Sequence, residues 1–130
     1  MRPFLGKLEP YIYSILRIVI GFLFLWHGSQ KLFGFPPMPA GMPAPMLYTA
    51  GIIEFFGGVM LVFCIFVPLV AFITCGEMAV AYFMVHAPHA FLPIINQGEL
   101  AVLFCFTFLF FAANGAGKWS VDSMIFKKKK

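Results

Sequence analysis

The chain has 130 residues, of which 62% are hydrophobic and 11% are charged, and its formal net charge is +4. Its mean hydropathy is +0.93. This composition leaves too little polar surface to cover a water-soluble globule, so it predicts one integral membrane domain. The basic excess indicates membrane topology and contact with anionic lipid, and the sequence contains no nucleotide loop or nucleic-acid motif.

Apolar runs separated by proline-rich breaks predict an all-α fold, a bundle of four transmembrane helices. The segment 34–46 carries five prolines and two glycines without a charge, so it is expected to be a loop. Pro88 and Pro93 bracket a second loop. At ~20 residues per span, the four helices are expected at residues 11–33, 47–67, 68–87 and 98–113. The length of the first span argues against a cleaved signal peptide.

The distribution of basic residues predicts the orientation of these spans. Eight of the nine lie toward the side that holds both termini, and only Lys31 lies toward the other. The positive-inside rule then places both termini in the cytoplasm and the two proline-containing loops on the outer side of the membrane. We expect a cytoplasmic segment at 1–10, a transmembrane domain at 11–114 and a basic tail at 115–130. The final lysines, Lys127–Lys130, are expected to contact anionic lipid.

Three of the five acidic residues lie inside or at the mouth of apolar runs: Glu54, Glu77 and Glu99. A carboxylate in hydrocarbon is costly unless it is paired, protonated or facing a wet cavity, so these residues are candidates for a functional site. Helix rise places His27 and Glu54 in the outer half of the membrane, with Glu77 near the midplane.

Helical phase predicts which faces meet. Glycine beside a polar residue allows two helices to approach closely, so Glu54 is expected to point into the bundle. One stripe of the first span and one face of the second have this character: Arg17, Gly21, Phe24, Gly28 and Lys31, with His27 on the flank, and Gly51, Glu54 and Gly58. Near the cytoplasmic face, Arg17 is expected to pair with Asp122.

Four segments in order resemble one known family: RIVIGFLFLWHGSQKLFG at 17–34, GIIEFFGGVMLVF at 51–63, GEMAVAYFMVHAP at 76–88 and NQGELAVLFCFTFLFFAANGAGKWSVD at 96–122. Taken together, the HG..K and E..GG elements and the terminal G-x-G-K-W-S-x-D resemble the DoxX family of small bacterial membrane proteins. The resemblance implies a four-helix membrane bundle that works with redox systems. A related subunit belongs to a thiosulfate:quinone oxidoreductase, and other members accompany thiol-stress partners, so protein partner subunits are expected.

These observations lead to a hypothesis of a quinone-binding pocket in the outer half of the bundle. Glu54 and His27 would be the hydrogen-bonding and proton-accepting pair, Glu77 a deeper relay, and Lys31 or Glu99 the rim. A structural alternative has His27 hydrogen-bonded to a carbonyl or to Glu54, and Glu77 protonated. A quinone site predicts a lateral cleft with aromatic walls.

Two other classes of function remain open. A non-catalytic scaffold subunit would expose a face of small residues to its partner helices. A small-solute or copper carrier would use thioether and imidazole groups, which suit Cu(I), although no metal site is favoured; the candidates are Met38, Met42, Met46, His86 and His89. The three cysteines, Cys64, Cys75 and Cys105, are expected to pack separately as small hydrophobic residues.

Overall fold

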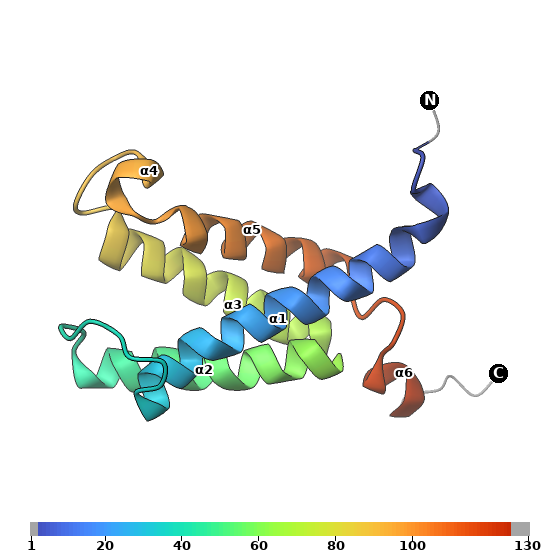
Figure 1. Cartoon of the computed structure of the whole chain (residues 1–130), viewed down its shortest axis with the longest axis horizontal. Coiled ribbons are helices and arrows are strands. Elements are labelled where there is room, and N and C mark those ends of the chain that lie inside the picture. The colour runs from blue at the N-terminus through green and yellow to red at the C-terminus, as the bar shows by residue number, and fades with distance from the viewer. Residues whose placement is uncertain (1–2, 126–130) are drawn as a thin grey trace.

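The computed structural model describes residues 3–125, and all regular secondary structure in that range is helical. This confirms the predicted all-α class. In chain order the elements are η1 (Gly6–Leu8), α1 (Glu9–Phe33), α2 (Ala44–Phe63), α3 (Val67–Ala81), the π-helical turn η2 (Tyr82–His86), α4 (Pro93–Asn96), α5 (Glu99–Asn114) and α6 (Val121–Ile125) (Figure 1).

Three helical segments are long and apolar enough to cross a membrane: Gly6–Phe33, Ala44–Phe63 and Val67–His86. The fourth apolar helix, α5, has 16 residues. At ~1.5 Å per residue it is roughly 24 Å long, shorter than the ~30 Å hydrocarbon core of a bilayer. The four expected spans therefore correspond to three long helices and one short one.

The boundaries of α2 differ from those expected, for reasons of backbone conformation. The helix begins at Ala44, inside the predicted loop, because Pro45 occupies its first turn, where no amide hydrogen is needed. It ends at Phe63, before the expected end at residue 67. Cys64 and Phe66 adopt φ values of 59° and 48°, and this left-handed conformation stops the helix before Pro68 is reached.

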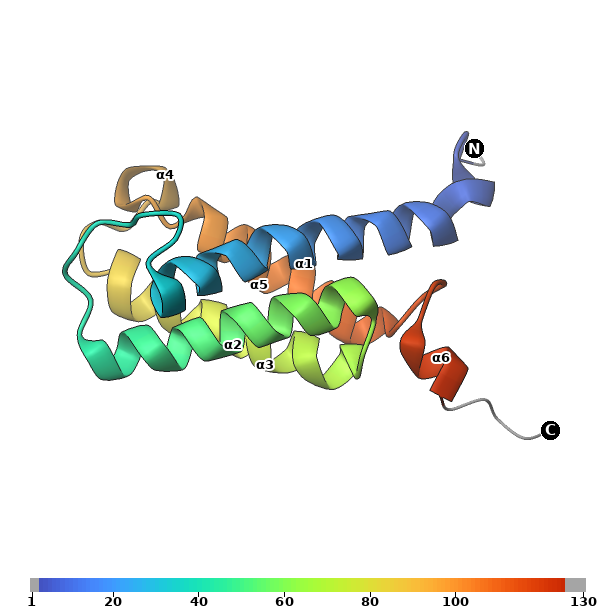
Figure 2. The ribbon, with the colours of Figure 1, turned by 60° about the horizontal axis from the view of Figure 1, so that its bottom comes forward.

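The main helices form two antiparallel pairs. α1 packs along α2, and α3 packs along α5, while α2 and α3 are joined by a tight turn at residues 64–66 (Figures 1 and 2). We call the end of the molecule with segments 34–43 and 87–98 the loop end. The opposite end, where α1 begins and α6 lies, is called the terminal end (Figure 2).

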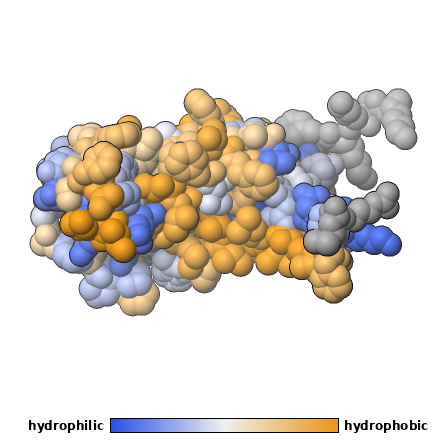
Figure 3. Space-filling model, turned by 90° about the horizontal axis from the view of Figure 1, so that it is seen from above, coloured by the Kyte–Doolittle hydropathy of each residue, from blue (hydrophilic) through white to orange (hydrophobic). Residues whose placement is uncertain are grey.

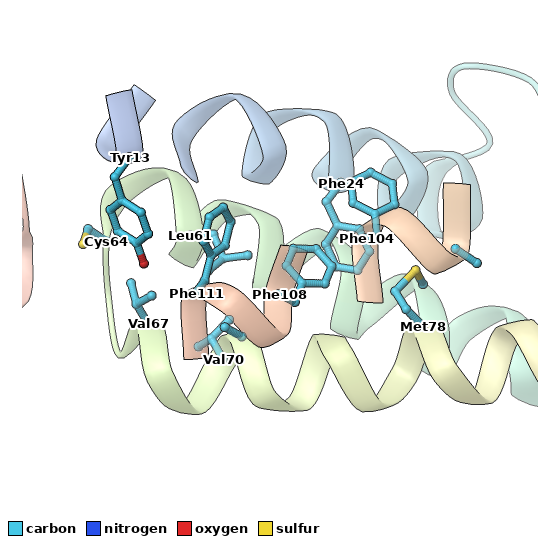
Figure 4. Close-up of a cluster of buried hydrophobic side chains, with 12 residues drawn as sticks. Tyr13, Phe24, Leu61, Cys64, Val67, Val70, Met78, Phe104, Phe108 and Phe111 are labelled. Carbon is cyan, nitrogen blue, oxygen red and sulfur yellow. The ribbon is translucent and has the colours of Figure 1, made fainter. Parts of the chain in front are cut away.

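Aromatic packing joins the two pairs at the centre. The ring of Phe24, from α1, is fully buried and lies 4.7 Å from the ring of Phe108 and 5.3 Å from that of Phe104, both on α5 (Figure 4). These tilted and edge-on contacts are favourable for aromatic pairs at this separation. Leu61 of α2 and Phe111 of α5 extend the same core toward the terminal end.

The outward faces of the helices are as apolar as their inward faces. Phe72, Leu103 and Phe106 are 67%, 65% and 65% exposed. Hydrophobic side chains cover much of one face of the molecule, with hydrophilic ones gathered toward its two ends (Figure 3). A helix that is apolar all round is typical of a protein that lies in lipid.

Glycines bring α1 and α2 into backbone contact, as the helical phase predicts. A Cβ atom at Gly28 would lie 2.2 Å from the backbone nitrogen of Phe55, and one at Gly58 would lie 2.6 Å from that of Leu25. In the same way, a Cβ atom at Gly21 would lie 2.9 Å from the carbonyl oxygen of Gly58. In lipid no hydrophobic effect holds two helices together, so close packing of this kind must do so.

Arg17 ties the end of the chain to α1 and α2. Its guanidinium is fully buried and donates to the carbonyl oxygens of Leu61 at 3.0 Å, Ala116 at 2.6 Å and Trp119 at 3.2 Å. Residues 115–120 therefore pack against the bundle, although they were expected to begin a tail. Lys127–Lys130 lie outside the described residues.

The expected ion pair between Arg17 and Asp122 is wrong. No such pair forms within residues 3–125, and the Oδ1 atom of Asp122 is buried without a hydrogen-bond partner. The physical reason is that carbonyl oxygens in the last turn of α2 and in the segment after α5 already accept from the guanidinium, which carries five N–H donors.

Gly28→Ala should destabilise the fold, because the added methyl group meets the backbone of α2, which has no means of moving locally. We expect a loss of about 1–3 kcal/mol in unfolding free energy, as for other overpacked sites, measured by thermal unfolding in detergent. Gly76→Ala is the matched control, since a Cβ atom there meets nothing within 4 Å. Equal melting temperatures for the two variants would contradict the close contact.

Arg17→Gln should lower the unfolding free energy by about 1.5–3 kcal/mol, the range for hydrogen bonds to a charged group. Asp122→Asn should leave the melting temperature unchanged or raise it, because its buried oxygen has no partner to lose. The two changes should be additive in the double variant. If the double variant lost clearly less stability than the sum of the two single variants, Arg17 and Asp122 would interact after all.

Candidate functional site

A cavity of about 620 Å³ lies between the two helical pairs, in the half of the molecule toward the loop end. Most of its wall is apolar. Val80, Met84 and Leu100 line it and are also 56%, 57% and 49% exposed, so it opens sideways to the outside of the bundle. Its polar lining residues are His27, Lys31, Thr49, Glu54, Glu77, His86 and Gln97.

An ion pair between α1 and α2 forms the polar centre of the cavity. The Nζ atom of Lys31 lies 2.5 Å from Oε2 of Glu54, and their side chains are only 12% and 4% exposed. Glycines make this geometry possible. A Cβ atom at Gly51, one turn before Glu54, would lie 3.0 Å from Cβ of Lys31, so the lysine stem occupies space that a side chain would otherwise take.

Glu77 brings a second carboxyl group to this pair from α3. Its side chain lines the same cavity as Lys31 and Glu54, while its Oε2 atom is buried with no donor facing it. Two carboxyl groups and one ammonium group therefore gather on the cavity wall, from three different helices.

His27 lies on the same wall, one helical turn from Lys31. It lines the cavity together with Glu54 and Lys31, and its ring lies 5.9 Å from that of Phe104 in an edge-on contact. Among the hydrogen bonds of residues 3–125, none involves the His27 ring. The structural expectation of a histidine bonded to a carbonyl or to Glu54 is therefore not met, and its nitrogens are available to a ligand.

The second loop is organised around Asn96, which holds the loop-end rim of the cavity. Its side chain donates to the hydroxyl of Tyr82 at 3.2 Å and to the carbonyl of Ala90 at 2.9 Å, and its Oδ1 accepts from the amide of Gly98. The Nδ1 atom of His86 lies 3.1 Å from the Asn96 carbonyl oxygen. As a result His86, at the end of η2, faces the cavity in a fixed position.

Four of the five residues expected at the site line the cavity together: His27, Lys31, Glu54 and Glu77. Glu99 does not. It is exposed in the first turn of α5, where a carboxylate is favoured by the positive end of the helix. The rim role proposed for Glu99 thus finds no support in its position.

Only some of the methionine and histidine candidates for copper line the cavity. Met42, Met46 and His86 line the cavity, and Met38 and His89 do not. In the described part of the chain, no group of three or more His, Cys, Asp or Glu gathers at metal-binding separation.

Sequence reasoning missed two polar residues and the character of the wall. Thr49 and Gln97 line the cavity from positions beside loops, where helical depth gives no estimate of location. The walls were expected to be aromatic, but methionine is more frequent than phenylalanine among the lining residues: Met42, Met46, Met78 and Met84, against Phe24 and Phe104. Methionine adapts to ligands of irregular shape.

The comparisons with known proteins agree with the helical pattern. The sequence profile of the DoxX family matches residues 12–87, more than half of the chain. An uncharacterized protein of Haemophilus influenzae is 43% identical over 131 residues, covering 95% of this chain and 98% of its own length. A Bacillus subtilis protein described as "Putative oxidoreductase CatD" is 26% identical, over 89% of this chain and 88% of its own. No solved structure matches.

Breaking the ion pair from one side should be costly, because the surviving charge stays buried without a partner. We expect Lys31→Met and Glu54→Gln each to lower the unfolding free energy by about 3–5 kcal/mol, and the double variant to lose clearly less than the sum. Thermal unfolding in detergent measures all three, with Glu99→Gln as an exposed control. Strict additivity would mean that Lys31 and Glu54 do not interact.

Proposed function

Because this chain belongs to the DoxX family, we propose that it is a redox-associated subunit of a membrane complex. The family and the apolar helices together indicate a multi-pass membrane protein. The oxidoreductase description of the Bacillus subtilis relative favours a redox role for this chain as well.

The finer proposal is that the cavity receives the headgroup of a quinone. The observation that carries it is the combination of a largely apolar cavity with one compact polar group on its wall, formed by Lys31, Glu54, Glu77 and His27. A volume of about 620 Å³ lies within the range of small-molecule sites. A sideways opening admits a molecule dissolved in the bilayer.

The residues present fit a quinone. The Oε2 atom of Glu77 is buried without a partner, and an O–H group of the reduced form, a hydroquinone, would donate to it. Lys31 and the N–H group of the His27 ring are able to donate hydrogen bonds to a quinone carbonyl oxygen. When bound, a quinone supplies the capacity to take up two electrons and two protons.

Side chains of the cavity would accept and release the protons. Glu54 and Glu77 would place two carboxyl groups beside the headgroup, and His27 would be positioned to accept or release a proton. Lys31 contacts Glu54 directly, which leaves Glu77 as the carboxyl group free to exchange a proton with the headgroup.

The topology remains part of the proposal. We place α5 as a short fourth span that completes a four-helix bundle, with both termini in the cytoplasm and the loop end outside the bacterial inner membrane. The eight-to-one distribution of basic residues supports this orientation. Protein partner subunits, and anionic lipid at Lys127–Lys130, belong to the same proposal.

The scaffold alternative has less support. It requires small residues on an exposed face, but Gly21, Gly28, Gly51 and Gly58 are used in the contact between α1 and α2. Partner helices would instead meet bulky side chains such as Phe72 and Phe106.

Two variants test the quinone site. Glu54→Gln keeps the side-chain volume and removes the charge, and His27→Ala removes a donor and acceptor. Each should lower the quinone bound per purified protein about tenfold, the equivalent of one charge-assisted hydrogen bond. Quinone-linked turnover per assembled complex should fall with it.

Glu99→Gln is the matched control, since it changes a glutamate outside the cavity and should leave both quantities at the wild-type level. The amount of assembled complex is measured in parallel, so that lost assembly is not mistaken for lost binding. If both cavity variants kept the wild-type quinone content and turnover, the quinone proposal would be wrong and the scaffold alternative would replace it.

A further inference from the structure

Two cysteines that are far apart in the sequence meet in the fold. The Sγ atom of Cys75, on α3, lies 3.6 Å from the Sγ atom of Cys105, on α5, and both residues are partly exposed free thiols. The expectation that the three cysteines pack separately is therefore wrong for this pair. The sequence held no signal for it, because the contact depends on how α3 and α5 are aligned.

The third cysteine has a different environment. Cys64 is fully buried in the turn after α2, and its sulfur lies 3.0 Å from the carbonyl oxygen of Ala116. That contact gives Cys64 a structural role at the terminal end. It therefore serves as an internal control for the other two.

The geometry of the pair suits a disulfide. A disulfide bond is ~2.05 Å long, so the two sulfurs must approach by roughly 1.5 Å. α3 and α5 already pack along each other, and both side chains lie at the edge of the core and not inside it. Rotation about the side-chain bonds at this edge displaces few neighbours.

We propose that Cys75 and Cys105 form a redox-active dithiol that a lipid-soluble oxidant of the quinone class converts to a disulfide. Two S–H bonds break and one S–S bond forms. The two electrons and two protons released reduce one quinone to one hydroquinone. Bacterial envelopes already use quinone as the acceptor for electrons from protein thiols.

The position of the pair selects this kind of oxidant. Phe72 and Phe106, which are close to the two cysteines in sequence, are 67% and 65% exposed. In the proposed membrane placement this apolar surface faces lipid, and both cysteines are themselves partly exposed, so a molecule dissolved in the bilayer reaches the sulfurs. The cysteines do not line the cavity, although Phe104, which precedes Cys105, does. A disulfide here would clamp α3 to α5.

The identity of the oxidant rests on the proposed function, whereas the thiol pair does not. The experiment therefore uses two oxidants on the full chain in lipid nanodiscs. One is duroquinone, whose ring positions are all methylated, which disfavours thiol addition. The other is diamide, a general thiol oxidant. Free thiols are then alkylated under denaturing conditions, and intact mass and peptide mapping locate the bond.

We expect both oxidants to remove the alkylation sites at Cys75 and Cys105 and to lower the mass of the chain by two hydrogen atoms. One hydroquinone should appear per disulfide. Cys64→Ser should behave like the wild type, and Cys75→Ser should leave Cys105 fully alkylated.

Full alkylation of both cysteines after both oxidants would overturn the dithiol. A disulfide that forms with diamide and not with duroquinone would overturn quinone as its oxidant. Glu54→Gln separates this inference from the proposed function: if quinone retention is unchanged in that variant while duroquinone still yields the disulfide, the cavity proposal fails and the dithiol stands.

Discussion

The backbone contact between α1 and α2 is the constraint on which the rest of the structure depends. Lipid is as apolar as the helix surfaces, so water exclusion does not press the helices together, and close packing must do so. Gly28 and Gly58 let the two backbones touch. One turn closer to the loop end on each helix, the same register brings Lys31 against Glu54. The polar centre of the cavity is thus a consequence of the glycine contact.

The cavity exists because the second helical pair does not close on the first at the loop end. Aromatic rings of α1 and α5 join the pairs at the centre, while the wall toward the loop end is built from flexible methionines and the Asn96 loop. A buried ion pair is expensive to desolvate, and a simple bundle would be as stable with apolar residues there. Its presence beside a cavity argues for binding or proton chemistry over a purely structural role.

At the terminal end, the polar groups that need partners are backbone carbonyls. Backbone carbonyls at helix ends have no partner within the helix and no water in lipid. Arg17 satisfies carbonyls of α2 and of segment 115–120 with one guanidinium. This contact holds the G-x-G-K-W-S stretch against the bundle. Within that stretch, Gly117 adopts a φ of 71° and lies against Tyr13. Arg17 and Lys31 therefore make buried polar contacts toward opposite ends of the same helix.

The sequence by itself determined the helical class, the approximate spans, the glycine-lined faces and the association of Glu54 with the bundle interior, because composition and helical period depend only on neighbours along the chain. It also indicated four of the cavity residues, since ionisable and polar groups in apolar runs single out His27, Lys31, Glu54 and Glu77. The tertiary structure alone decided which groups touch. It gave Arg17 carbonyl partners in place of Asp122, left Glu99 outside the cavity and paired Cys75 with Cys105. These outcomes depend on the axial alignment of helices joined by long segments, which local periodicity does not specify.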